Sequence, residues 1–264
     1  PDVPLRFELT VELPGTPQQV WEAIATSAGN AAWFMPTDVE EREGGAICFH
    51  MGDEAESRGT VTGWDPPRRF AIEEPDWASL TGHEGAPVTP LATEYLIEAG
   101  SGGTCVVRVV SSAFGTGADW EQEFLDEMEK GWAPFFENLR LYLTHFAGRR
   151  VTRMDLAVDV PGKPPAVWAD LRRGLGLDGP DVVGTTVAVR DVTAVVHRVD
   201  DGYALLRATD PVAGMLGAYV YARDDDVATA NLAAYLFSDG ADGWVAQERP
   251  AWERWLRDLA LPGG

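Results

Sequence analysis

Two stretches of the chain, 147 positions apart, repeat one local plan. ELTVELPGTPQQVWEAI (residues 8–24) and DLAVDVPGKPPAVWADL (residues 155–171) each indicate a strand, a Pro-Gly turn and a helix that carries a tryptophan. Seven residues are identical over the 18 positions that start at Phe7 and at Met154, where average composition gives roughly one. The repeat predicts two related domains, 1–148 and 151–264, that arose by duplication and divergence.

The first half continues mainly as strands. Gly29-Asn30 is expected to end the first helix, and a short second helix or turn carries Trp33 and Phe34. Further strands follow, separated by Gly, Pro and Asp residues: AICFHM, SRGTVTGWD, RRFAIEE, ATEYLIEA and TCVVRVVSSAF. Consecutive strands with no helix between them are typical of an antiparallel meander.

A long amphipathic helix is predicted to close the first half. Its apolar residues recur at spacings of three and four: Leu125, Met128, Trp132, Phe135, Leu139, Tyr142 and Phe146. Acidic residues fill its first turns, and Pro134 is expected to kink or restart it. The economical packing is a helix grip, in which the sheet curls around the helix, so the predicted fold class is α+β. A curved sheet and a single helix commonly leave a cavity between them.

The second half repeats this plan in a shorter form. Its strands are predicted at TRMDLAVDV, TTVAVRD, TAVVHRV, GYALLRA, GAYVYARD and ANLAAYLFS. The alignment of the two ends implies that 30 residues have been lost, and WERWLRDLAL predicts a closing helix of only about three turns. A shorter helix covers less sheet, so we expect a smaller cavity there or none, with Trp21 and Trp168 as packing anchors.

The first half resembles a domain of the START-like (SRPBCC) superfamily. Within it, the similar branch is named after the activator of the ninety-kilodalton heat-shock protein's ATPase. The matching segments are TPQQVWEAIATSAGNAAWF, GTVTGWDPPRRFAIE, GGTCVVRV and GWAPFFENLRLYL, which together span most of residues 5–146. The resemblance implies a helix-grip fold for the first half. The second half resembles the family only at its first strand and helix, so tandem helix-grip domains are expected from the internal repeat. Related families bind lipids, hormones or polyketides, or catalyse cyclisation, without a shared catalytic residue, so the resemblance implies a cavity but no reaction.

Charge and hydropathy exclude several classes of partner. The formal net charge of -21 has the wrong sign for binding nucleic acid, and no apolar run reaches the ~18 residues of a membrane span. Cys48 and Cys105 lie mid-strand without a Cys-x-x-Cys spacing, so two buried, reduced thiols and a cytoplasmic location are expected.

Neither a metal site nor a catalytic centre is predicted, and no cofactor is implied. The four histidines, at positions 50, 83, 145 and 197, fall on separate segments, and none has a His or Cys partner at metal-ligand spacing. Glu73, Glu74 and Arg108 lie near apolar strands, but alternation places Arg108 and at least one glutamate outside. They do not form a pair that predicts acid–base catalysis.

Alternation selects the candidate ligand-binding residues. Residues expected to face the closing helix lie on three strands, and others lie at the start of that helix or in the long segment 75–90, which is a candidate lid. The predicted set is Phe49, Met51, Phe70, Trp77, Tyr95, Trp120, Phe124 and Met128. Tyr95 is singled out because an inward phenol needs a hydrogen-bond partner.

Three functions remain open on the sequence. The leading hypothesis is non-catalytic binding of a small hydrophobic molecule in the first domain. The alternatives are a protein-interaction module like the co-chaperone activator, and an enzyme of the polyketide-cyclase kind. A polar cluster deep inside the first domain would favour the enzyme.

Overall fold

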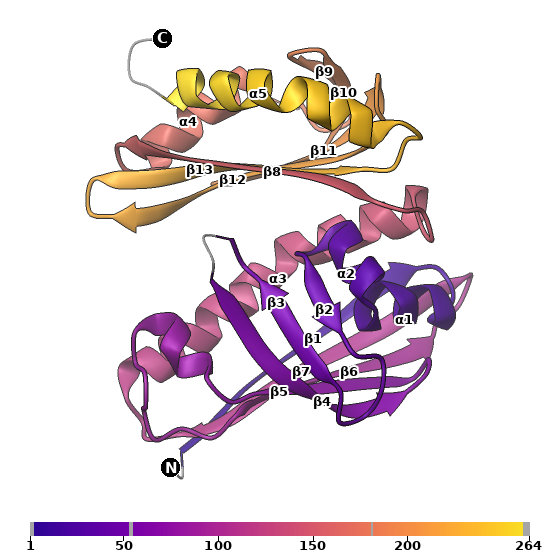
Figure 1. Cartoon of the computed structure of the whole chain (residues 1–264), viewed down its shortest axis with the longest axis vertical. Helices are drawn as coiled ribbons and strands as arrows, with labels where there is room; N and C mark the ends of the chain where they lie inside the picture. The colour runs from indigo at the N-terminus through magenta and orange to yellow at the C-terminus, as the bar shows by residue number, and fades with distance from the viewer. Residues whose placement is uncertain (1–2, 53–54, 181, 261–264) are drawn as a thin grey trace. The chain divides into compact units, whose positions relative to one another are not determined.

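The computed structural model describes residues 3–52, 55–180 and 182–260. The chain divides into two compact units, Pro1–Gly148 and Arg149–Gly264. Each unit holds one antiparallel sheet with helices on one of its faces, so the chain is α+β, with a helix-grip arrangement repeated in tandem (Figure 1).

The first unit contains a seven-stranded sheet in the order β1-β7-β6-β5-β4-β3-β2. Strands β2 to β7 form the meander, and β1 pairs with β7 from Val3↔Gly115 to Pro14↔Thr104. The elements are β1 (Val3–Pro14), α1 (Pro17–Ala25), α2 (Ser27–Trp33), β2 (Thr37–Val39), β3 (Ala46–His50), β4 (Glu56–Asp65), β5 (Arg69–Glu74), the 3₁₀ helix η1 (Trp77–Thr81), β6 (Leu91–Ala99), β7 (Thr104–Gly115) and α3 (Asp119–His145). The short strand β2 was not predicted.

Helices α1 and α2 meet at a sharp corner. The predicted break at Gly29-Asn30 is wrong, because α1 ends at Ala25 and the chain turns at Thr26. The Thr26 hydroxyl accepts a hydrogen bond from the Gly29 amide (3.0 Å), which caps α2. Gly29 belongs to α2, and a Cβ added there would lie 1.9 Å from the Glu22 carbonyl oxygen. The glycine therefore permits the close approach of the two helices and does not break one.

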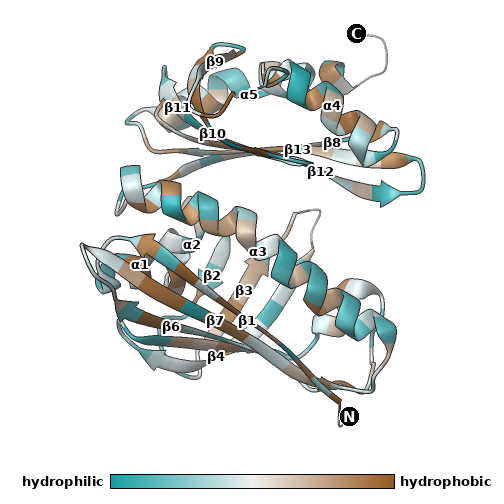
Figure 2. Ribbon diagram, turned by 180° about the vertical axis from the view of Figure 1, so that it is seen from behind, coloured by the Kyte–Doolittle hydropathy of each residue, from teal (hydrophilic) through white to brown (hydrophobic). Residues whose placement is uncertain are grey.

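Helix α3 runs without interruption through Pro134. It lies close to β1 along one face of the sheet, and its buried residues include Leu125, Trp132 and Leu139 of the predicted stripe (Figure 1). The exposed side of its N-terminal half is mostly hydrophilic (Figure 2). Its position confirms the predicted packing of a closing helix against a curved antiparallel sheet.

The second unit contains a six-stranded sheet in the order β8-β13-β12-β11-β10-β9. Helices α4 and α5 contact one face of it. The elements are β8 (Thr152–Pro161), α4 (Pro164–Gly174), β9 (Thr186–Val189), β10 (Val192–Asp200), β11 (Tyr203–Asp210), β12 (Gly214–Asp224), β13 (Val227–Leu236) and α5 (Ala241–Ala260).

The closing helix of the second unit is longer than predicted. Helix α5 has 20 residues and includes Pro250, whereas the sequence indicated about three turns starting near Trp252. It still falls short of the 27 residues of α3. None of the helices in the described part of the chain is both long and apolar enough to span a membrane.

The core of the second unit combines small strand residues with large helix residues. Alanines dominate the sheet face under the helices, among them Ala194, Ala204, Ala218 and Ala230. Trp168 and Trp252 from α4 and α5 are buried against them. Close packing requires such complementary volumes, because unfilled space forfeits dispersion contacts.

Candidate functional site

The inner face of the first sheet, on the side of α3, carries buried polar groups on four adjacent strands. Alternation with buried apolar residues places them there, and the sheet register brings them together. The group consists of Ser57 on β4, Glu74 on β5, Thr93 and Tyr95 on β6, and Ser111 on β7. Burying polar groups costs free energy unless they are paired, so a sheet built only for packing would carry apolar residues here.

Glu74 is a buried carboxyl inside the first unit. Its side chain is 8% exposed and accepts a hydrogen bond from the Ser57 hydroxyl. Burial raises the pKa of Glu74, and the bond from Ser57 offsets part of that rise. A carboxyl with a raised pKa can hold a proton closer to neutral pH than an exposed one, and can therefore donate it.

Two further hydroxyls that point into the first unit form a hydrogen bond with each other. Thr93 and Ser111 are directly opposite on β6 and β7, and their side-chain oxygens lie 2.9 Å apart. Either oxygen can donate, so each retains capacity for another hydrogen bond.

Tyr95 lies at the centre of the interior aromatic residues. Its ring stacks on Phe70 with 5.8 Å between centroids and meets Trp132 nearly edge-on at 6.1 Å. Burial raises the pKa of the Tyr95 phenol, and the charge of Glu74 adds to the rise. The charge of Glu74 therefore acts on the Tyr95 phenol through the low-dielectric interior.

Trp132 brings an unpartnered donor to this region. Its ring stacks between Phe34 (5.7 Å) and Phe136 (5.2 Å). The buried indole nitrogen Nε1 has no hydrogen-bond partner among the described residues. Buried polar groups in proteins are rarely left unpaired, and each exception calls for a water, a ligand or a functional reason.

Four apolar side chains at the border of the interior are partly exposed. Phe34, Phe49, Met128 and Phe135 all point toward this aromatic group or lie next to it on α3, yet each remains partly exposed. Phe34 contacts Phe135 at 4.6 Å and Phe49 at 6.2 Å between ring centroids. Solvent therefore reaches aromatic side chains that border the buried polar groups.

Segment 75–90 packs on the start of α3. Trp77 is fully buried, and its Nε1 donates to the Thr89 carbonyl oxygen (2.9 Å). Its ring contacts Phe124 (5.0 Å), while His83 stacks on Trp120 with 4.1 Å between centroids. The segment is thus anchored by aromatic contacts to the N-terminal half of the helix.

The predicted ligand-binding residues fall into separate groups. Phe49, Phe70 and Tyr95 belong to the interior aromatic group, with Met128 half-buried on α3 one turn before Trp132. Trp77, Trp120 and Phe124 contact one another under segment 75–90. Met51 is 40% exposed just beyond the end of β3 and joins neither group.

Several interior residues were missed from the sequence. The alternation Phe70, Ile72, Glu74 on β5 could have identified the buried glutamate, with Glu73 and Arg108 exposed as predicted. Ser57, Ser111 and Trp132 gave no such signal, because a lone serine in a strand or a tryptophan in an apolar stripe is usually structural.

The second unit has an apolar interior. Its buried polar residues in the described part of the chain are Thr229 and Asn231 on β13, which alternate with the core residues Ala228, Ala230 and Leu232 and so lie on the opposite face of the sheet. A hollow of about 590 Å³ lies instead near α4 and the end of β10, with Arg172, Asp200 and Asp201 among its lining residues. A smaller cavity or none was expected in the second unit, and this hollow is bordered by exposed residues such as Val183 and Asp201.

Comparison with known proteins finds a family similar to the first unit. Residues 14–144 match the model of the Activator of Hsp90 ATPase homolog 1-like protein family. No curated protein matches the chain.

The solved structures that are similar to this chain include proteins that it matches over nearly its whole length and proteins that it matches over about half. The di-domain ARO/CYC BexL from the BE-7585A biosynthetic pathway is 13% identical with a TM-score of 0.46, covering 97% of each chain. DynU16, a putative protein in the dynemicin biosynthetic locus, is 16% identical with a TM-score of 0.44, covering 98% of each chain. The Aha1 dimer from Colwellia psychrerythraea is 16% identical with a TM-score of 0.42, covering 53% of this chain and 96% of its own. The match to the Activator of Hsp90 ATPase homolog 1-like family therefore lies wholly within the first unit, Pro1–Gly148.

Proposed function

We propose that the first unit binds a small, largely apolar molecule that carries a hydrogen-bond acceptor, between α3 and the inner faces of β4 to β7. The observation that carries this proposal is the unpartnered Nε1 of Trp132 beside Tyr95. A carbonyl oxygen on the guest would satisfy that donor, and leaving it unpaired costs about 1–3 kcal/mol.

Aromatic side chains would supply most of the contact area for such a guest. Phe34, Phe49 and Phe135 already meet one another and are partly exposed, so a flat or ring-containing molecule could replace water on them. Sites for small molecules commonly combine apolar walls with a few placed polar groups. Segment 75–90, the candidate lid, is held by Trp77 and His83 against Trp120 and Phe124 at the start of α3.

An acid–base reaction on the bound molecule is the second candidate. It is favoured by Glu74, a buried carboxyl with a raised pKa that shares its surroundings with the Tyr95 phenol. Such a pair can give a proton to a developing oxyanion and stabilise it, as cyclisation of a polyketone would need.

The test is calorimetric titration of the full chain with apolar probes that bear carbonyls: anthraquinones, flavonoids, aromatic acids and fatty acids. Trp132→Phe removes the donor, and Trp252→Phe is the matched control, because it removes another buried, unpartnered indole in the second unit. We expect Trp132→Phe to weaken binding about 5–30-fold, the equivalent of ~1–2 kcal/mol, and Trp252→Phe to leave it unchanged.

Two results would contradict the binding proposal: no probe binds, or Trp132→Phe and Trp252→Phe affect binding equally. A stoichiometric protein partner with no small-molecule binding would favour the interaction-module alternative. Turnover of a polyketone that Glu74→Gln abolishes while binding persists would establish the enzyme.

A further inference from the structure

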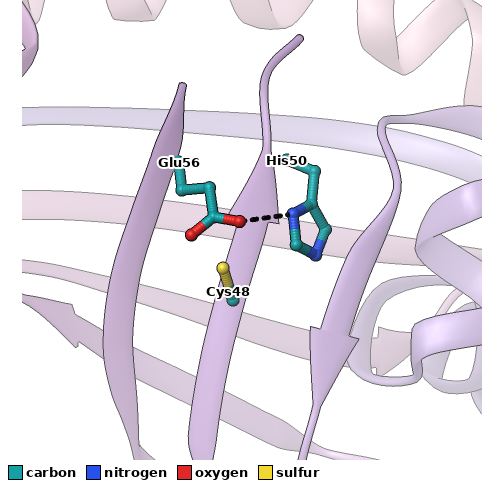
Figure 3. Close-up of side chains that lie close together, drawn as sticks. All are labelled: Cys48, His50 and Glu56. Atoms are coloured by element: carbon teal, nitrogen blue, oxygen red, sulfur yellow. Dashed lines mark hydrogen bonds and ion pairs between the residues drawn. The ribbon is translucent and has the colours of Figure 1, made fainter. Parts of the chain in front are cut away.

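The outer face of the first sheet gathers a second polar cluster at the β2–β3–β4 edge. Cys48 and His50 lie two residues apart on β3 and so share a face. The register places Asp38 of β2 opposite Cys48 and Glu56 of β4 opposite His50. Figure 3 shows the side chains of Cys48, His50 and Glu56 converging in front of β3 and β4.

The imidazole of His50 is held from both of its nitrogens. Nδ1 lies 3.1 Å from Glu56 Oε1, and Nε2 lies 2.8 Å from Asp38 Oδ2. The ligand atoms offered by Cys48, His50 and Glu56 all lie within 4.8 Å of one another. Sulfur, nitrogen and carboxylate oxygen thus converge on one small volume at the surface.

We propose that Cys48 Sγ, His50 Nδ1 and Glu56 Oε1 form a binding site for a divalent transition metal, with zinc as the best match. Zinc accepts thiolate, imidazole and carboxylate ligands together, whereas magnesium and calcium select oxygen alone. With three protein ligands, a tetrahedral ion keeps its fourth position for water or another ligand.

Asp38 fits the role of a positioning residue. Ligating histidines usually donate their other ring N–H to a carboxylate, which fixes the tautomer and the ring orientation. An Nε2–H donated to Asp38 leaves the lone pair of Nδ1 on the side of Cys48 and Glu56. The aspartate would therefore select the nitrogen that binds the metal.

The existing distances are close to those that a metal requires. Bonds of about 2.0–2.1 Å at tetrahedral angles separate a nitrogen and an oxygen ligand by about 3.3 Å, near the 3.1 Å between His50 and Glu56. The Cys48 sulfur would have to move toward His50 and Glu56 by on the order of 1 Å to reach the zinc–sulfur distance of about 2.3 Å. Cys48 is only half-buried and Glu56 is exposed, so their side chains can make this movement by changing rotamer.

Arg58 is a cation that already pairs with Glu56 beside the proposed site. Its guanidinium pairs with Oε2 of Glu56 and leaves Oε1 toward His50. Its side chain is 75% exposed, so it can move away from an incoming cation at little cost.

This cluster corrects two expectations. Cys48 is half-buried on the outer face and not enclosed, and His50 does have a cysteine at ligand spacing. A Cys-x-His pair on a strand aligns both side chains on one face, so the sequence could have indicated these two. The two carboxylates come from neighbouring strands, and the spacing of residues along the sequence does not reveal them.

Titration of the EDTA-treated, dialysed full chain with Zn²⁺ and Co²⁺ tests the site. We expect one equivalent to bind, with a thiolate-to-cobalt charge-transfer band. Cys48→Ser should abolish that band, and Cys48→Ser and His50→Gln should each weaken zinc binding at least tenfold. Asp38→Asn should weaken it about 10-fold, as expected of an orienting partner. Cys105→Ser and His83→Gln, on residues away from the cluster, are the matched controls.

Melting temperatures in EDTA separate a metal ligand from a folding defect, because variants at this exposed edge should melt like the wild type. The proposal is overturned if no stoichiometric metal binds, or if binding and the cobalt band survive Cys48→Ser and His50→Gln. A loss of binding in the Cys105 or His83 controls alone would likewise overturn it.

Discussion

The hydroxyls of Thr93 and Ser111 lie 2.9 Å apart, on directly opposite residues of β6 and β7. Both residues are at most 2% exposed, so neither hydroxyl can exchange its partner for bulk water. On the buried inner face of the sheet, each hydroxyl of this pair therefore depends on the other for its hydrogen bond.

Removing both members of that pair should cost less free energy of unfolding than the two single removals added together. Thr93→Val or Ser111→Ala alone leaves a buried hydroxyl unpaired, at about 1–3 kcal/mol. The double variant should be less destabilised than the sum of the two. Native-state hydrogen exchange at β6 and β7 amides measures the coupling within the first unit. Additivity within about 0.5 kcal/mol would show that the hydroxyls do not depend on each other.

Glycine substitutions in two helices of the first unit should have opposite effects. Gly29→Ala places a Cβ 1.9 Å from the Glu22 carbonyl oxygen, which should destabilise the unit by about 1–3 kcal/mol. Gly131→Ala in α3 meets nothing within 4 Å and should stabilise it by about 0.5–1 kcal/mol. Thermal melting of the full chain compares them. If both variants shifted the melting temperature equally and in the same direction, the result would contradict the close approach of α1 and α2.

Glu121 should make the start of α3 sensitive to acid. Burial alone would raise its pKa, but hydrogen bonds from Thr116 and Gly117 hold the pKa below the ordinary value. The resulting stabilisation is complete above the unfolded value of about 4.3 and is lost as pH falls through the folded pKa.

Glu121→Gln should therefore lower stability by about 1.5–3 kcal/mol at neutral pH and by progressively less below pH ~4.3. Urea denaturation at a series of pH values measures the difference. A constant difference between variant and wild type across that range would rule out a role for the carboxylate charge.

Glu74 should show the opposite dependence on pH. Because its folded pKa is raised, the buried carboxyl stabilises the protein only while protonated, and this contribution is lost as pH rises through the folded pKa. Glu74→Gln keeps the shape of the side chain and an oxygen that can accept the hydrogen bond from Ser57, but the amide carries no charge. The variant should match the wild type near pH 4 and become relatively more stable as pH rises. Denaturation midpoints across that interval provide the measurement, and a pH-independent offset would mean that Glu74 does not titrate inside the unit.

The sequence by itself determined much of the architecture. The repeat around Trp21 and Trp168 indicated the duplication, and alternation located the strands and placed Phe49, Phe70 and Tyr95 on the inner face. These features are local, since a period of two in a strand or 3.6 in a helix is set by backbone geometry. The predicted length of α5 was wrong. A proline usually ends a helix, so the sequence indicated a helix only after Pro250, whereas in the folded chain α5 continues through Pro250.

Only the tertiary structure decided which polar groups meet. Ser57 and Glu74 are 17 residues apart, and Asp38 reaches His50 from a different strand 12 residues away. The curvature of the sheet and the position of α3 also sandwich Trp132 between Phe34 and Phe136. Such contacts depend on strand register and helix docking, which arise from the summed packing of the whole core, and no short window of sequence encodes them.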